Sequence, residues 1–362
     1  MRIVIGGDFS NEISGDSLAA LSSGKAEKVF DKGVLDLFKT ADEVTVNLEC
    51  AVTESGHEIK KFGPNLKAPF GTGAVLKDAG VTFVSLSNNH IFDFGKEGVK
   101  DTIKELDKNG IKYTGYGKNE ADSRKDYIIE KDGLKIAVID VCEHEYSYAL
   151  ENREGARPYD PYDTSDDIVA AKKKADYVIV IYHGGKEMCR YPSPRLLKLC
   201  RSMIKHGADV VLCQHSHCVG CYENFEGGHI LYGQGNFYFI DNKAYGTEKE
   251  DIWCNGLAVV LDVDKSGIKF TPVPVVMKGD MLYLAEGKEK DKILNGLNER
   301  SKTLADGSYI KGWRAFCDTV PWYKTAVPPE KADILGHWIE CEAHYDVMRE
   351  LYKTYNQTNE LD

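Results

Sequence analysis

Three histidines follow two apolar stretches of the sequence. His183 comes directly after YVIVIY at residues 177–182, and His215 and His217 come after DVVLCQ at residues 209–214. Both runs are β-branched and lack polar alternation, which is typical of strands buried on both faces of a mostly parallel sheet. The carboxyl ends of such strands share one edge, where ligands bind. Imidazoles at that edge predict a metal site for zinc, iron, nickel or copper, and neighbouring carboxylates would admit manganese.

Acids, an amide and a fourth imidazole follow three further apolar runs. The runs and their side chains are 2–7 with Asp8, 42–48 with Glu49, and 81–86 with Asn89, His90 and Asp93. A mixture of acids, an amide and imidazoles suits two divalent metals about 3.5–4 Å apart, with one carboxylate bridging them. Such a pair lowers the pKa of a water molecule and holds phosphoryl oxygens, while an imidazole that is not a ligand can protonate the leaving group. The pattern therefore predicts metal-dependent hydrolysis of a phosphoester.

The elements that must position these residues alternate between strands and helices. Apolar periodicity predicts helices over residues 26–39, 73–80, 98–109 and 168–174, and an irregular connection over 151–167. Hairpins are predicted at 127–141 and 256–276, around Lys-Asp-Gly and Asp-Lys-Ser-Gly turns. His144, just beyond the first hairpin, belongs either to the cleft or to a solvated loop.

Composition limits the class of protein. The 362 residues carry a net charge of −11 without a Lys/Arg stripe, which argues against a nucleic-acid partner. We find neither a signal-peptide pattern nor an apolar run of about 18 residues, so no membrane span is expected and the predicted location is cytoplasmic. The ten cysteines are typical of reduced thiols, and the Cys218-x-x-Cys221 pair with Cys213 is a weak signal for a thiolate site.

The order of the motifs resembles the poly-gamma-glutamate capsule biosynthesis family, CapA, a branch of the calcineurin-like metallophosphoesterases. The motifs are Gly-Asp, Asn-Leu-Glu, Ser-Asn-Asn-His-x-x-Asp, His-Gly-Gly-x-Glu, His-Ser-His and Gly-x-Gly-Asn-Phe. They cover residues 1–239, and the resemblance extends to about residue 277. It implies a four-layer α/β/β/α sandwich with two mixed β-sheets in a domain of residues 1–280. Residues 281–362 are then expected to form a C-terminal helical extension or cap.

The resemblance also implies a role for each site residue. Asp8 and His217 would bind the first metal, Glu49 would bridge, and Asn89, His183 and His215 would bind the second. His90 would be the general acid, oriented by Asp93. Manganese is the metal expected, with iron, zinc or magnesium as alternatives.

Two residues depart from the wider superfamily. Ser10 stands where that superfamily has a histidine, which should weaken or alter the first metal site. Glu49 replaces the usual bridging aspartate, and its longer side chain changes the metal geometry, although this agrees with the capsule branch.

Three functions remain open from the sequence. The first is a hydrolase acting on a small-molecule or polymer phosphoester, linked to capsule or cell-surface polymer biosynthesis. The second is an accessory protein that binds a polyanion or glycan without hydrolysing it, together with other capsule-biosynthesis proteins. Its acidic charge makes that binding awkward unless metals or Lys60, Lys61 and Lys67 intervene. The third is a scaffold that has lost the chemistry, with Ser10 as the evidence.

Overall fold

Two mixed β-sheets form the centre of the molecule in the computed structural model, which describes residues 1–11, 15–61, 63–143, 145–240, 250–320, 327–328 and 331–351. The first sheet has the order β18-β17-β16-β1-β2-β5-β6, and β15 pairs with the carboxyl half of β1. Its strands are β18 (Met281–Leu284), β17 (Gly267–Lys278), β16 (Asn255–Asp264), β1 (Arg2–Asn11), β2 (Glu43–Leu48), β5 (Phe83–Ser85), β6 (Lys112–Thr114) and β15 (Asn236–Ile240). Strands β1, β2, β5 and β6 run parallel, and β16 to β18 add antiparallel neighbours.

The second sheet has the order β13-β14-β12-β11-β9-β8. Its strands are β13 (Tyr222–Phe225), β14 (Gly228–Leu231), β12 (Val210–Gln214), β11 (Tyr177–His183), β9 (Leu134–Cys142) and β8 (Tyr127–Lys131). The four central strands are parallel, and the outer pairs are antiparallel. Two small ribbons complete the strands: β3 (Ala51–Val52) with β4 (Lys67–Ala68), and β7 (Tyr116–Gly117) with β10 (Gly155–Ala156).

The two sheets pack face to face through one apolar cluster. Ile3 and Ile5 of β1 and Val259 of β16 contribute from the first sheet, and Val138 of β9 and Ile181 of β11 contribute from the second. Because the strands are buried on both faces, their β-branched side chains form continuous apolar runs in the sequence. The interior between the sheets is therefore the central core layer.

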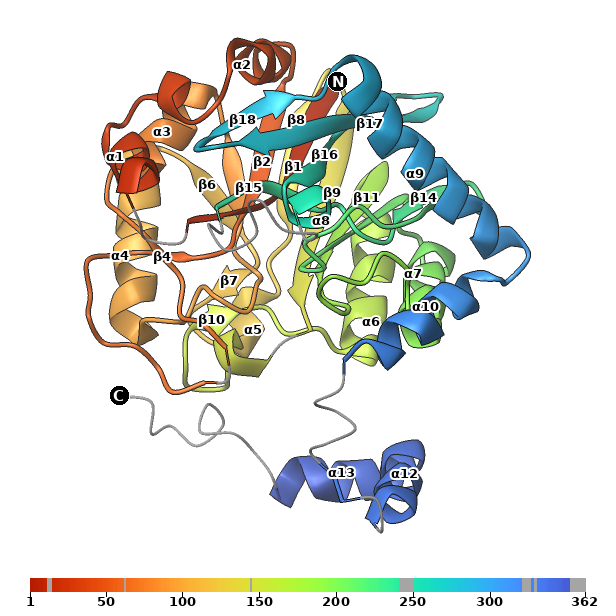
Figure 1. Ribbon diagram of the computed structural model, residues 1–362. Helices are drawn as coiled ribbons and strands as arrows, with labels where there is room; N and C mark the ends of the chain where they lie inside the picture. Colours follow the sequence, from red (N-terminus) through yellow and green to blue (C-terminus); the bar gives the residue numbers. More distant parts are fainter. Residues whose placement is uncertain are drawn as a thin grey trace.

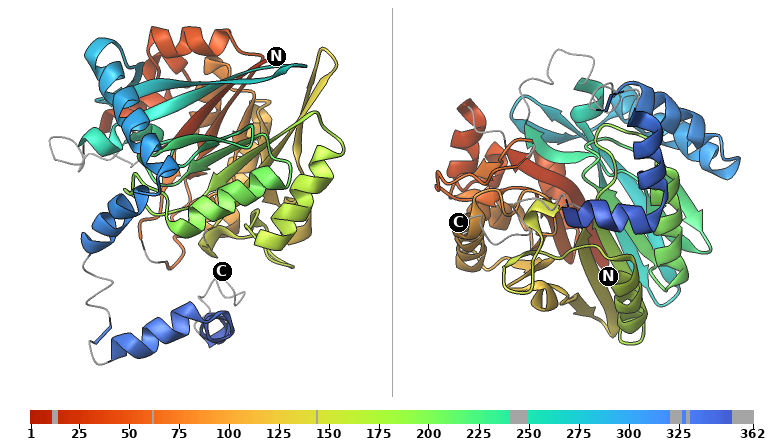
Figure 2. Two further views of the ribbon diagram at one scale, coloured as in Figure 1. Left: turned by 90° about the vertical axis from the view of Figure 1, so that its right-hand side faces the viewer. Right: turned by 90° about the horizontal axis from the view of Figure 1, so that it is seen from below.

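Helices cover both outer faces, which completes four layers (Figures 1 and 2). One outer cluster packs α2 (Lys32–Lys39), α3 (Thr72–Ala79) and α4 (Gly95–Lys108) on the first sheet. The other packs α6 (Pro161–Lys172) and α7 (Pro194–Lys205) on the second. The remaining helices are α1 (Gly15–Ser22), α5 (Glu120–Ser123), α8 (Glu250–Trp253), α9 (Gly287–Ala305), α10 (Tyr309–Asp318), α12 (Ala332–Glu340) and α13 (Glu342–Leu351). The four-layer sandwich expected from the sequence is confirmed.

The four expected helices are present with shifted bounds, and the helices predicted at 26–39 and 168–174 differ most from the structure. The helix predicted over 26–39 is interrupted, because the Asp31 carboxylate accepts hydrogen bonds from the backbone N–H groups of Gly33 and Val34 and so begins α2 there. The prediction of an irregular connection over 151–167 was wrong for its second half, which is helical. Asp160 caps a helix that has Pro161 at its first position, and α6 therefore begins seven residues earlier than the predicted helix at 168.

The region after residue 280 combines a strand with helices. Met281–Leu284 is β18 of the first sheet rather than part of a helix, and Ile293 and Leu297 of α9 pack into the core between the sheets. Figure 1 shows α12 and α13 set apart from the sheets. Among the described residues, none of the helices combines the length and the apolarity needed to cross a membrane.

Candidate metal centre

The predicted site residues meet at the carboxyl ends of parallel strands from both sheets. Asp8 lies at a register shift in β1, and Glu49 follows β2, where its backbone N–H donates to Phe9 O at 2.9 Å. His183 ends β11, and His215 follows β12 directly. Asp8, Glu49 and His183 are completely buried, and His215 and His217 are nearly so. The sheets thus bring together side chains that lie up to about two hundred positions apart in the chain.

Asp8 is held by hydrogen bonds from both sheets. Its Oδ1 accepts from Asn47 Nδ2 at 2.8 Å, and its Oδ2 accepts from the backbone N–H of His215 at 3.0 Å. Asn47 Nδ2 also lies 3.1 Å from His183 Nδ1. The Asn47 amide is itself fixed by Asn88, whose Nδ2 donates to Asn47 Oδ1. This network of amides sets the orientation of both a carboxylate and an imidazole.

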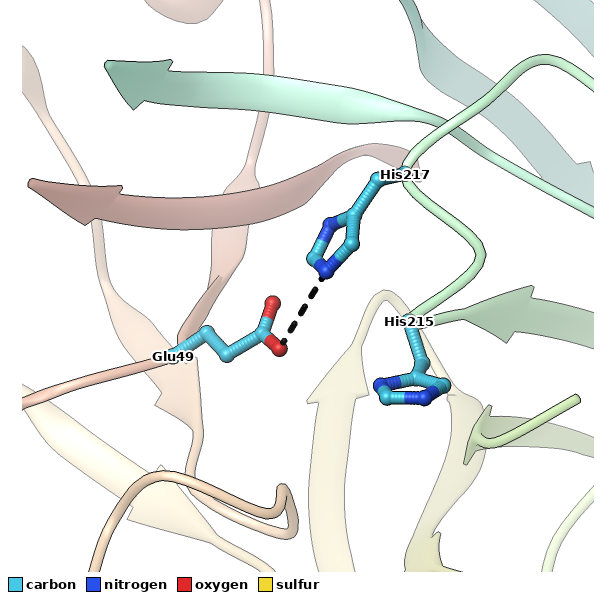
Figure 3. A group of neighbouring side chains, drawn as sticks. All are labelled: Glu49, His215 and His217. Atoms are coloured by element: carbon cyan, nitrogen blue, oxygen red, sulfur yellow. Dashed lines mark ion pairs between the residues drawn. The ribbon is translucent and has the colours of Figure 1, made fainter. Parts of the chain in front are cut away.

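Glu49 lies at the centre of the arrangement. Its Oε1 is 3.3 Å from His183 Nε2 and 4.0 Å from His217 Nε2. Both carboxylate oxygens are buried, and neither accepts a hydrogen bond from the described residues. Figure 3 shows the Glu49 side chain directed toward His217, with His215 on the same loop as His217. A buried carboxylate without a hydrogen-bond donor is what a cation would satisfy.

Two groups of possible metal ligands share Glu49. One contains Asp8, Glu49 and His183, and the other contains Glu49, His215 and His217; within each group the ligand atoms lie within 4.8 Å of one another. Glu49 is therefore the residue that the two groups have in common. Asp8 shares a group with His183, but His217 Nδ1 also lies 3.4 Å from Asp8 Oδ2, so Asp8 is close to both imidazoles.

The loop after β12 holds its two histidines in an uncommon backbone conformation. His215 and His217 have φ values of 77° and 52°, in the left-handed region that side chains other than glycine rarely adopt. His217 Nδ1 lies 2.9 Å from Asn236 Oδ1, and its ring packs against Trp253 with centroids 4.8 Å apart. These contacts fix the ring, so that Nε2 remains directed toward Glu49.

His90 and Asp93 form a pair beside the possible ligands. His90 Nδ1 lies 2.6 Å from Asp93 Oδ2, and the preceding Asn89 places its Oδ1 2.9 Å from His183 Nε2. Lys61 is almost completely buried, lies 3.0 Å from His90 Nδ1 and forms an ion pair with Asp93. The sequence analysis predicted that His90 and Asp93 interact, but it did not predict the contact of Lys61 with both.

Electrostatics distinguish the groups of the site. Burial raises the pKa of Glu49 well above its usual range, and the neighbouring Asp8 charge adds to this effect. Burial alone would lower the pKa of His217, but the Glu49 and Asp8 carboxylates raise it to about 9. Burial lowers the pKa of His183 to about 4. Burial also opposes the negative charge of Asp8, yet the hydrogen bond with His217 and the nearby imidazoles lower the pKa of Asp8. The site therefore favours added positive charge close to its two acids.

Several residues of the site escaped the sequence interpretation. Asn47 lies within the Asn-Leu-Glu motif, and Asn236 lies within Gly-x-Gly-Asn-Phe. Both motifs were recognised, but no role was predicted for either asparagine. Trp253 had no motif. Ser10 is buried in β1. His144 lies outside the described residues.

Two mixed sheets between helical layers form a four-layer α/β/β/α sandwich with acids and imidazoles gathered at one edge. The model of the bacterial capsule synthesis protein family PGA_cap matches residues 2–241, and the chain belongs to this family.

Relatives of known name carry capsule or polyglutamine descriptions. The chain is 33% identical over 219 residues to the PGA biosynthesis protein CapA of Bacillus subtilis, covering 59% of this chain and 57% of that protein. It is 33% identical over 210 residues to the capsule biosynthesis protein CapA of Bacillus anthracis, covering 56% and 51% respectively. A probable polyglutamine synthesis accessory protein of Mycobacterium tuberculosis is 28% identical over 214 residues, covering 55% of this chain and 56% of that protein. The chain thus spans little more than half the length of these relatives.

Solved structures show weaker similarity. A hypothetical protein from Thermus thermophilus aligns with a TM-score of 0.48 and 17% identity, covering 77% of this chain and all of that one. A phosphatase from Mycoplasma pneumoniae aligns with a TM-score of 0.46 and 15% identity, covering 76% and 93% respectively.

Proposed function

We propose that this chain is a metal-dependent hydrolase of phosphoesters within the capsule synthesis family. The observation that carries the proposal is Glu49, a buried carboxylate that accepts no hydrogen bond from the described residues and is shared by two groups of possible ligands. Burying such a group is costly unless a cation compensates it. The substrate is a small-molecule or polymer phosphoester, and the partners are other proteins of capsule biosynthesis, as the names of the relatives suggest.

Each site residue has a part in this proposal. Glu49 would be shared by two ions, and Asp8, Asn89, His183, His215 and His217 would supply the remaining ligands, with manganese as the preferred metal and iron, zinc or magnesium as alternatives. The bound ions would supply Lewis-acid activation of water and of the phosphoryl group. Asn47 and Asn236 orient Asp8 and His217 through the hydrogen bonds described above, and orientation of this kind sustains metal affinity.

His90 supplies the proton for the leaving group. Burial lowers its pKa, although the Asp93 carboxylate opposes this effect. Asp93 accepts hydrogen bonds from the His90 ring and from the backbone N–H of Leu66, so it fixes the ring from the Nδ1 side. The other ring nitrogen is then available to a substrate oxygen. Lys61 offsets the buried charge of Asp93.

The test combines metal analysis with assays of phosphatase and phosphodiesterase activity after reconstitution with manganese. We expect bound metal and turnover, and we expect His90→Ala to lower kcat about 10²- to 10⁴-fold while the metal content is retained. A chain that binds no metal and hydrolyses neither substrate class after reconstitution would refute the proposal.

The accessory role is the second candidate, and the description of the mycobacterial relative as an accessory protein favours it. In this role the pocket binds a polyanionic chain without cleaving it. Polymer binding that is equal in the wild type and in His90→Ala, with no hydrolysis in either form, would support the accessory role over the enzyme.

A further inference from the structure

A cavity of about 220 Å³ lies between α9 and two loops that continue from the candidate metal centre. Arg190 lines it from the loop that follows His183, and Val219 lines it from the loop that carries His215 and His217. The third wall is the segment around Asp251 and Asn255, which flanks Trp253, and Trp253 packs against His217. The cavity therefore adjoins the candidate metal centre through three separate segments.

The lining of this cavity is cationic in a chain whose net charge is −11. Arg190, Lys292 and Arg300 contribute positive charge, and Asp251, which forms an ion pair with Lys292, is the acidic residue of the lining. In the part of the chain that the structure describes, neither arginine has a carboxylate within ion-pair distance; Arg190 Nη2 donates only a long hydrogen bond to Asp251 O at 3.4 Å. Both guanidinium groups are partly buried, and planar guanidinium groups favour carboxylate or phosphate partners.

Backbone carbonyls hold Arg300 in place. Its Nε donates to Gly220 O at 3.0 Å, and its Nη2 donates to Val219 O at 2.8 Å. Burial lowers the pKa of Arg300, and the positive charge of Arg190 lowers it further, so the two groups repel each other. An anion between them would remove this repulsion. The guanidinium is thus oriented before any ligand arrives, which reduces the entropy lost on binding.

Gly296 makes room for the remaining nitrogen of Arg300. It lies in the interior of α9, where glycine costs about 1 kcal/mol of helix stability relative to alanine. A Cβ at this position would lie 3.0 Å from Arg300 Nη1. An alanine here would press on Nη1, which would have to move by a few tenths of an ångström from its position in the cavity wall.

We propose that this cavity is a binding site for an oxyanion, a phosphate or carboxylate group, which the guanidinium groups of Arg190 and Arg300 hold together. Planar guanidinium groups match both kinds of oxyanion with paired hydrogen bonds. The site is separate from the two groups of possible metal ligands and does not depend on hydrolysis.

Isothermal titration calorimetry on the full chain tests this site, with sodium phosphate and sodium glutarate as alternative probes. Titrations before and after EDTA treatment separate the cavity from the metal centre, because anion binding at the metals would disappear with EDTA. We expect saturable binding after EDTA, with the tighter probe indicating whether phosphate or carboxylate is preferred. Arg190→Gln should weaken binding about tenfold, since it removes charge-assisted hydrogen bonds.

Two further variants make the result specific. Gly296→Ala should also weaken anion binding, although its helix propensity should maintain or raise Tm, so loss of binding cannot be attributed to unfolding. Lys288→Gln removes a charge from the exposed surface of the same helix and should change affinity less than about twofold. The proposal is overturned if neither probe binds after EDTA, or if Arg190→Gln and Gly296→Ala bind as tightly as Lys288→Gln.

Discussion

Glu49 lowers the stability of the metal-free fold and lies at the centre of the candidate metal centre. The side chain is completely buried, and burial together with the Asp8 charge raises its pKa well above the usual range. A carboxyl whose pKa is higher in the folded chain than in the unfolded chain reduces stability at pH values above its unfolded pKa. Such a residue suits a chain that binds a cation at this point.

Replacing Glu49 with glutamine should therefore raise the thermal stability of the metal-free protein and reduce the stabilisation that added manganese gives. Without metal, at pH 8, we expect Glu49→Gln to raise Tm by about 2 °C or more, the shift that about 1 kcal/mol produces in a large domain. With manganese, the wild type should gain thermal stability and the variant should gain much less. Differential scanning fluorimetry with EDTA or with manganese measures both effects.

Glu130→Gln is the control for this comparison, because Glu130 lies at the surface in an ion pair with Lys135. It should leave Tm and the response to manganese nearly unchanged. If manganese stabilises Glu49→Gln as much as the wild type, Glu49 is not a metal ligand.

The loop after β12 shows how an element positions the site under strain. His215 and His217 adopt positive φ values within three residues of the strand end, where glycine would be the usual choice. Strain of this kind costs about 1–3 kcal/mol for each residue and persists where the surrounding structure holds it. Here the Asn236 and Trp253 contacts, and the hydrogen bond from the His215 N–H to Asp8, hold it.

The strain predicts a difference between two substitutions at the same position. His217→Gly and His217→Ala both remove the imidazole, but only glycine accommodates the φ value of 52° without strain. We expect the glycine variant to be more stable than the alanine variant by about 1 kcal/mol in urea denaturation of the EDTA-treated protein.

His183 provides the matched control, because it ends β11 in ordinary strand conformation. At this position the order should reverse, with His183→Ala more stable than His183→Gly. Equal stability of the two His217 variants would show that the loop relaxes and stores no strain.

At the scale of the whole molecule, a buried acid joins the two sheets. Asp140 of β9 accepts a hydrogen bond from the backbone N–H of Ser87, which follows β5 of the first sheet. Gly115, with a φ of 75°, lies against it, and a Cβ there would be 2.0 Å from Asp140 Oδ2. Burial raises the pKa of Asp140 to about 7, although the hydrogen bond from the Ser87 N–H opposes this effect. The fold therefore prefers Asp140 protonated.

This preference sets a pH dependence of the free energy of unfolding. Between pH 4 and pH 7 the folded chain keeps the Asp140 proton while the unfolded chain releases it, so this residue makes stability fall as pH rises through that window. Asp140→Asn should remove the effect, so that the stability of the variant relative to wild type rises by up to about 3 kcal/mol between pH 5 and pH 8. Urea denaturation at the two pH values measures the difference.

Asp107→Asn, an exposed substitution on α4, is the control and should shift stability little at either pH. An Asp140→Asn variant whose stability relative to wild type does not rise between pH 5 and pH 8 would contradict the interpretation.

The apolar runs of the sequence predicted the strands that carry the site, and the motif order predicted the four-layer fold and the family. The end of each run located Glu49, His183 and His215 at strand ends, because strand composition and the position of the first polar residue are local properties. Asp8 instead lies within β1, which continues to Asn11. The interruption of the helix over 26–39 and the early start of α6 were missed, although Asp31 and Asp160 with Pro161 are local cap signals.

The sequence by itself determined which side chains end the strands and which family they belong to, since both depend on residue order alone. Only the tertiary structure decided that Glu49 is common to two groups of possible ligands, that Asn47 and Asn236 orient Asp8 and His217, and that two arginines line a cavity next to them. These relations depend on how two sheets pack and how loops distant in the chain meet, and no local pattern of residues encodes those distances.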